Sequence, residues 1–197
     1  MLNRLTIRLV IVMVAFLAPA VPAAPPQTPA PPTSAVPRPD VGARIPTGTR
    51  GISGSIYVGE SAPGFDLENA YRRRIKLASF RGGRVMLIFA DRRETISEYR
   101  QTADSLLTMG IRLISISRDS PRGLRALAER DSLGFELLSD PTGEISASYG
   151  SYDFATSSIR AGYVLVGRTS LVRMALLGQK LPPDDLLKIT RYALIGL

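Results

Sequence analysis

Cysteine, histidine and tryptophan are all absent from this chain of 197 residues. Thiolate and imidazole are the side chains that dominate zinc, copper and haem ligation, so metal-dependent redox chemistry of these kinds is not expected. The same absences exclude catalytic sets of the Ser-His-Asp and Cys-His types. They also leave the folded chain without disulfides, which a domain of roughly 150 residues does not need for stability.

Two sequence motifs are missing as well. The chain contains neither a G-x-x-x-x-G-K-[ST] loop for phosphates nor an Asp-rich loop of the calcium-binding type. We therefore expect no cofactor and no metal ion. The carboxylates of Glu94 and Glu98 are spaced one helical turn apart, as acid–base pairs can be. On a first helical turn this spacing favours interaction with the helix dipole instead.

Basic residues outnumber acidic ones by 25 to 17, which gives a formal net charge of +8. An excess of this size favours anionic surfaces such as lipid headgroups or acidic envelope polymers. Three consecutive arginines at 72–74 are expected at the solvated tip of a hairpin. Because no aromatic residues alternate with the basic ones and no nucleic-acid motif occurs, specific nucleic-acid binding is not predicted.

Residues 1–23 have the three parts of a secretory signal peptide. Arg4 and Arg8 form the positive region, residues 9–17 form a short apolar run, and small residues follow up to Ala23. The apolar run is well short of the ~20 residues that cross a hydrocarbon core. We expect cleavage and export to the periplasm or the extracellular space, with no transmembrane segment in the mature form.

The segment that follows, 24–51, is rich in proline and alanine and has no hydrophobic periodicity. Such a composition is typical of a disordered, extended linker. The remaining residues, 52–197, are expected to form one domain. With 45% hydrophobic residues, the chain has enough apolar surface for a core.

Within this domain, short apolar runs alternate with amphipathic stretches, which predicts an α/β fold with parallel strands. We expect strands at 85–90, 111–117, 135–138, 163–166 and 171–177, and helices at 95–109, 120–130 and 183–194. The first helix should begin near Thr95, bury Leu106 and Leu107 on one stripe, and end at Gly110. The second has a cap residue, Ser120, followed by a first-turn proline.

Several short blocks of this domain resemble, in the same order, the alkyl hydroperoxide reductase and thiol-specific antioxidant (peroxiredoxin) family. They are 59–67 (GESAPGFDL), 77–82 (LASFRG), 116–121 (ISRDSP), 138–143 (LSDPTG) and 149–150 (YG). The resemblance implies a thioredoxin-like fold with a central mixed sheet and helices on both faces. It also implies an active site at the first turn of the helix that follows the strand at 85–90.

At that site the sequence departs from the family. Counted from Phe89, the family's threonine falls on Thr95, and its peroxide-attacking cysteine falls on Glu98. The family's proline two residues after the phenylalanine is Asp91, while Arg160 matches the arginine that in the family holds the thiolate and peroxide. Thiol-type peroxide reduction needs a thiolate that cycles through a sulfenic acid, and a carboxylate has no comparable cycle. The resemblance therefore implies a degenerate site at Thr95, Glu98 and Arg160.

Two interpretations of Glu98 remain open. Thr95 and Glu98 have the T-x-x-E spacing of a capping box, in which both side chains bond free amides at a helix start. Alternatively, the Glu98 carboxylate forms an ion pair with Arg160 and fills the former pocket. Either interpretation makes the site structural rather than catalytic.

The expected function is therefore that of a non-catalytic binding or scaffolding module. Its partner would be an unknown protein, or the chain would form a homodimer or heterodimer. The alternative is an antioxidant or oxidoreductase role, as in the family, either by a route that needs no thiol or as partner subunit of a cysteine-bearing relative.

Overall fold

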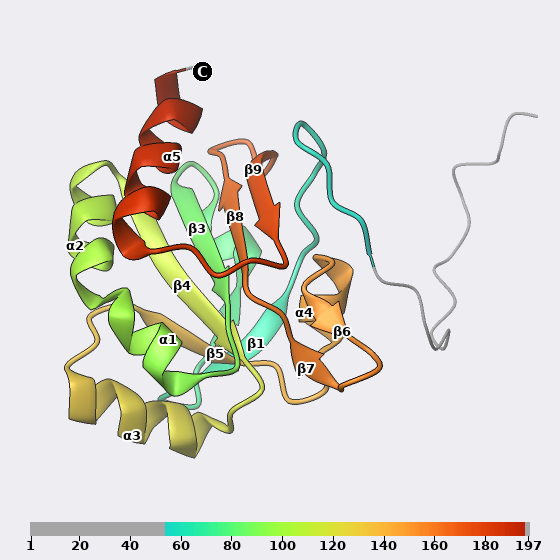
Figure 1. Ribbon diagram of the computed structural model, residues 1–197, viewed down its shortest axis with the longest axis vertical. Helices are drawn as coiled ribbons and strands as arrows, with labels where there is room; N and C mark the ends of the chain where they lie inside the picture. The colour runs from blue at the N-terminus through green and yellow to red at the C-terminus, as the bar shows by residue number, and fades with distance from the viewer. Residues whose placement is uncertain (1–53, 196–197) are drawn as a thin grey trace, which may run out of the picture. The chain divides into compact units, whose positions relative to one another are not determined.

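The computed structural model describes residues 54–195 (Figure 1). The predicted signal peptide at 1–23 and the predicted linker at 24–51 lie outside the described residues. Among the helices of 54–195, none combines the length and apolar character needed for a membrane span.

A seven-stranded sheet forms the centre of the domain, in the order β2-β1-β5-β4-β3-β8-β9. Its strands are β1 (Asp66–Asn69), β2 (Arg74–Lys76), β3 (Arg84–Phe89), β4 (Ile111–Ser117), β5 (Glu136–Ser139), β8 (Gly162–Val166) and β9 (Val172–Leu177). The ladders β3–β4 and β4–β5 are parallel, and the others are antiparallel. The prediction of a mixed sheet is thus confirmed. The alternation of strands and helices alone favours an all-parallel sheet, and that prediction is wrong.

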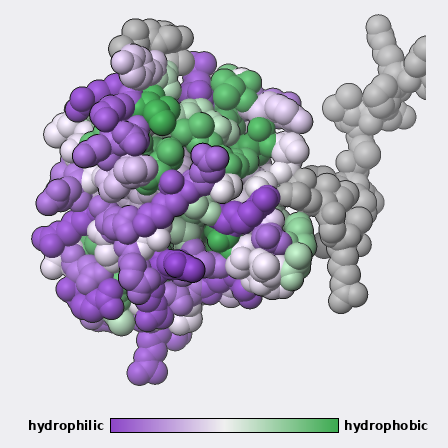
Figure 2. All heavy atoms as spheres, in the orientation of Figure 1, coloured by the Kyte–Doolittle hydropathy of each residue, from purple (hydrophilic) through white to green (hydrophobic). Residues whose placement is uncertain are grey.

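Helices cover both faces of this sheet, as predicted. They are α1 (Arg93–Glu98), α2 (Arg100–Thr108), α3 (Pro121–Asp131), α4 (Glu144–Ser148) and α5 (Pro183–Ile195), with a 3-10 turn, η1, at Leu77–Phe80. One apolar cluster joins the sheet to α1, α2, α3 and α5, and a second joins its other face to η1, α4 and the hairpin of β6 (Tyr152–Asp153) and β7 (Ser158–Ile159) (Figure 1). The surface over α1 and α3 is strongly hydrophilic (Figure 2).

Local signals account for α3. The Ser120 hydroxyl accepts a hydrogen bond from the Gly123 amide, and Pro121 occupies the first turn. Leu124 and Leu127 face the core. A polar N-cap followed by proline favours a helix start, so this helix forms where the sequence predicts it.

The prediction of one helix at 95–109 is wrong, because two helices, α1 and α2, occupy this segment. The first turn begins earlier, at Arg93, and the helical hydrogen bonding breaks at Tyr99, which caps α1 and precedes α2. The side chain of Tyr99 is fully buried. Leu106 faces the core as expected, but Leu107 is 62% exposed. Gly110, at φ +70°, ends the segment in the left-handed conformation that glycine adopts most easily.

Candidate functional site

The first turn after β3 carries the positions at which the sequence predicts the degenerate site. Arg92 is the N-cap of α1 and makes no side-chain capping bond. Thr95 is therefore the third helical residue rather than the cap, and its side chain is buried, at 8% exposure. Glu98 is the last residue of α1. The capping-box interpretation of Thr95 and Glu98 is wrong, because the helix starts three residues earlier than that motif requires.

Glu98 has a different partner from the one expected. Its carboxylate accepts a hydrogen bond from Lys180 Nζ at 2.7 Å, and both side chains are largely exposed, at 41% and 48%. The guanidinium of Arg160 instead donates to the carbonyl oxygen of Gly150 at 3.3 Å. The predicted ion pair of Glu98 with Arg160 does not form. An exposed pair such as Glu98 with Lys180 contributes only about 0–1 kcal/mol.

A pocket of about 500 Å³ opens beside Thr95, at the carboxyl end of β3. It is lined by Ala90, Asp91, Arg92, Thr95, Ser158, Ile159, Ala161 and Lys180. Of the three residues predicted for the site, the structure brings only Thr95 to this pocket. Glu98 and Arg160 do not line it.

Asp91 is the residue of this site whose role sequence reasoning misses. One carboxylate oxygen accepts a hydrogen bond from the Arg118 amide at 3.2 Å, and the other accepts one from the Ile159 amide at 2.7 Å. Asp91 thus links the end of β3 to the segment after β4 and to β7. The only sequence signal is an acidic residue directly after a central strand, at the position of the family's proline.

Arginines near Asp91 add further links between these loops. Arg118 donates from Nε to the Pro141 carbonyl at 3.4 Å and from Nη1 to the Ser157 carbonyl. Arg93 makes a two-bond contact with Asp119, at 2.7 and 3.2 Å. The hydrogen bonds to Asp119 raise the pKa of the Arg93 guanidinium above its ordinary value. The rim of the site is therefore held by charged contacts to fixed partners.

Behind α1, two buried tyrosines tie this region to the segment before α5. The hydroxyls of Tyr99 and Tyr163 lie 2.7 Å apart. Tyr99 donates to the Leu181 carbonyl at 2.6 Å, and the Leu181 amide donates to the Tyr163 hydroxyl at 2.9 Å. Burial, followed by the hydrogen bond to Tyr163, raises the pKa of the Tyr99 phenol far above its ordinary value. The Tyr99 phenol therefore remains neutral, and the two hydroxyls act as structural donors and acceptors.

This arrangement offers polar recognition but no redox-active side chain. The pocket presents the Thr95 hydroxyl, the Asp91 carboxylate and the cations of Arg92 and Lys180. Within 54–195, no group of three or more acidic, histidine or cysteine side chains is placed to hold a metal ion. The chemistry available here is hydrogen bonding and ion pairing with a small polar ligand.

Comparison with known proteins is consistent with this geometry. The family model AhpC/TSA matches residues 58–174. Peroxiredoxin Bcp of Escherichia coli is 31% identical over 101 residues, which cover 48% of this chain and 65% of that protein. The chloroplastic peroxiredoxin Q of Sedum lineare is 28% identical over 149 residues, covering 70% of this chain and 80% of that protein. The match thus spans less than two thirds of the length of the bacterial relative.

Solved structures show the same fold. The crystal structure of peroxidoxin BcpB from Mycobacterium tuberculosis has a TM-score of 0.64 and 17% sequence identity, and covers 72% of this chain and 98% of that one. The thioredoxin-like architecture predicted from the sequence is confirmed by this likeness.

Proposed function

This chain belongs to the AhpC/TSA family, and from that membership we propose that it is an exported redoxin domain that has lost thiol chemistry and acts by binding. The observation that carries the proposal is the residue at the position of the family's nucleophile. Glu98 stands there, its carboxylate bonds Lys180 at the surface, and it does not line the pocket. No cysteine elsewhere in the 197 residues can replace the missing sulfur.

The remaining site residues support binding rather than turnover. Arg160, at the position of the family's thiolate-holding arginine, donates to the Gly150 carbonyl and does not reach the pocket. Asp91 is held by two backbone amides. A general acid or base must reach its substrate's proton within about 2.6–3.2 Å, directly or through one water. Thr95 is at the pocket, but the oxygens of Asp91, the acid that lines the same pocket, accept from two backbone amides, and a threonine hydroxyl that no base activates is a poor nucleophile. We infer that this pocket holds a small polar ligand without transforming it.

A peroxide assay tests the loss of thiol chemistry. The purified protein is incubated with hydrogen peroxide, with and without a thiol reductant, beside a heat-denatured sample of the same protein. We expect no turnover above the denatured sample, and no change when Glu98→Gln or Arg160→Ala is introduced. Sustained turnover that requires the thiol reductant would overturn the proposal.

Export rests on the sequence of residues 1–23 and needs its own experiment. The chain is expressed in a Gram-negative host, and the periplasmic and cytoplasmic fractions are compared with those of a variant that lacks residues 1–23. We expect a shortened periplasmic product from the full chain and a cytoplasmic product from the variant. Retention of the full-length product in the cytoplasm would contradict export.

A further inference from the structure

A larger pocket, of about 650 Å³, lies at the other end of the parallel strands, where β4 begins. Its volume is within the ~300–1,000 Å³ range of sites that bind small molecules. None of its lining residues belongs to the pocket beside Thr95. A ligand bound here would therefore contact none of the residues of the proposed binding site beside Thr95.

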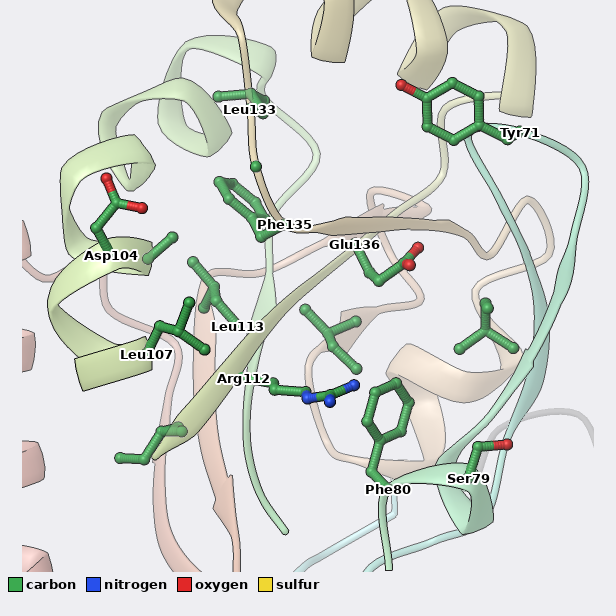
Figure 3. Close-up of a pocket in the computed structure, with 15 residues that line it drawn as sticks. Tyr71, Ser79, Phe80, Asp104, Leu107, Arg112, Leu113, Leu133, Phe135 and Glu136 are labelled. Carbon is green, nitrogen blue, oxygen red and sulfur yellow. The ribbon is translucent and has the colours of Figure 1, made fainter. Parts of the chain in front are cut away.

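The course of β5 explains why this space is open. Along β4, pairing with β3 starts at Ile111, but pairing with β5 starts only at the register Ile114↔Glu136. On the side of β5, the first residues of β4, including Arg112 and Leu113, therefore border the pocket instead of a second strand. Figure 3 shows the pocket between this strand, α2 and the turn that carries Phe80.

The walls are mainly apolar. Leu107, Leu113, Leu133 and Phe135 surround the space (Figure 3). Leu107 is expected from the sequence to face the core but is 62% exposed. Its place in the wall of this pocket explains that exposure. Tyr71, at 52% exposure, borders it as well. Large apolar side chains left in contact with water around a concave site mark a surface that an apolar group can cover.

One basic residue, Arg112, lines this mainly apolar pocket. The guanidinium of Arg112 lies 5.9 Å from the centre of the Phe80 ring, a contact that favours a fixed orientation. Within the described part of the chain, Arg112 has no acidic partner within salt-bridge distance.

Two acids also line the pocket, and neither neutralises Arg112. Glu136 accepts a hydrogen bond from Asn69 Nδ2 at 2.9 Å, and its other oxygen is 4.0 Å from Arg73. Glu136 therefore interacts with Asn69 and, at the limit of salt-bridge distance, with Arg73, and it forms no salt bridge with Arg112. Asp104 is on α2, and in Figure 3 its carboxylate lies away from the guanidinium of Arg112. Arg112 is thus the one cation among the described residues that line the pocket, and it is not in a salt bridge with either lining acid, so its guanidinium can pair with an anionic ligand beside the apolar wall.

We propose that this pocket binds an amphipathic organic anion, a carboxylate attached to an aliphatic or aromatic body. The carboxylate pairs with the planar guanidinium of Arg112, which can donate two parallel hydrogen bonds. The apolar body covers Leu107, Leu113 and Phe135 and removes them from water. The proposal does not depend on the chemistry of the Thr95 pocket.

The test is a titration of the ¹⁵N-labelled protein with octanoate, octanol and octylammonium, followed by amide chemical shifts. These probes share one alkyl chain and differ in charge. We expect saturable shifts centred on Leu113 and Phe135 with octanoate, and at least tenfold weaker binding of the other two probes. A hydrogen bond to a charged group contributes enough to make Arg112→Gln lower the octanoate affinity by about tenfold or more.

Arg122→Gln is the matched control, because it removes an exposed arginine from α3 that does not line the pocket. Its affinity for octanoate should equal that of the unmodified protein. Leu107→Glu places a negative charge at the rim without disturbing the core and should weaken octanoate binding. Equal binding of all three probes, an unchanged affinity in Arg112→Gln, or the absence of saturable octanoate shifts would each overturn the proposal.

Discussion

Removing the hydroxyl of Tyr99 should destabilise the domain more than removing an exposed contact at the degenerate site, such as the pair of Glu98 with Lys180. Tyr99 and Tyr163 are both fully buried. The proton of Tyr99 goes to the Leu181 carbonyl at 2.6 Å, so in the 2.7 Å contact between the two phenols Tyr163 must be the donor. Tyr163 in turn accepts from the Leu181 amide. Three hydrogen bonds therefore form a closed ring.

The variant Tyr99→Phe leaves the Leu181 carbonyl without its donor and the Tyr163 hydroxyl proton without its acceptor, while the bond from the Leu181 amide to Tyr163 remains. An unsatisfied buried polar group costs about 1–3 kcal/mol, and partial exposure of Leu181 lowers the cost for its carbonyl. We expect a loss of about 2 kcal/mol in the free energy of unfolding. Tyr163→Phe should cost about 1–2 kcal/mol, and the double variant should cost less than the sum because the two hydroxyls share one bond.

Urea unfolding followed by far-ultraviolet circular dichroism measures these costs in a chain that has no tryptophan. Tyr192→Phe is the control, because this tyrosine of α5 is 76% exposed and its variant should unfold like the unmodified protein. A cost below about 0.5 kcal/mol for Tyr99→Phe, or strictly additive costs in the double variant, would refute the reasoning.

Three further predictions concern carboxylates. Asp140 is 1% exposed and accepts hydrogen bonds from the amide and hydroxyl of Ser146, so Asp140→Ala should lower the unfolding free energy by about 2–4 kcal/mol in urea. Asp91→Ala should cost about 1–2 kcal/mol and broaden the amide resonances of the loops it links, whereas unchanged stability would count against those bonds. Hydrogen bonds from Arg130 and then Ser97 hold the pKa of Asp131 well below its usual range. Its contribution is therefore fully present at neutral pH and is lost as the pH falls below about 4. The difference in melting temperature between the unmodified protein and Asp131→Asn should shrink on acidification, and a constant difference would contradict this.

Local patterns predict much of the fold. Continuous apolar runs identify β3 and β4, and a cap residue followed by proline identifies the start of α3 at Pro121. These elements are specified by neighbours in the sequence. The family resemblance supplies the mixed sheet, because hydrophobic periodicity does not report strand direction.

The site depends on contacts that local patterns do not contain. Glu98 and Lys180 are 82 residues apart in the sequence, as are Tyr99 and Leu181. The break between α1 and α2 comes at Tyr99, whose hydroxyl donates to the distant Leu181 carbonyl. In the same way, Leu107 fits the apolar stripe of a helix but faces a pocket that exists because β5 diverges from β4. A pattern of residue types can therefore locate the site, but it does not show which side chains reach it.

The most direct test of the loss of thiol chemistry is the number of hydrogen peroxide equivalents that one chain consumes in the presence of a thiol reductant. The chain has five methionines, each of which can be oxidised once to the sulfoxide, and no cysteine. Uptake should therefore stop at no more than five equivalents per chain and should not depend on the thiol. Continued consumption beyond that number, at a rate set by the thiol concentration, would contradict the account.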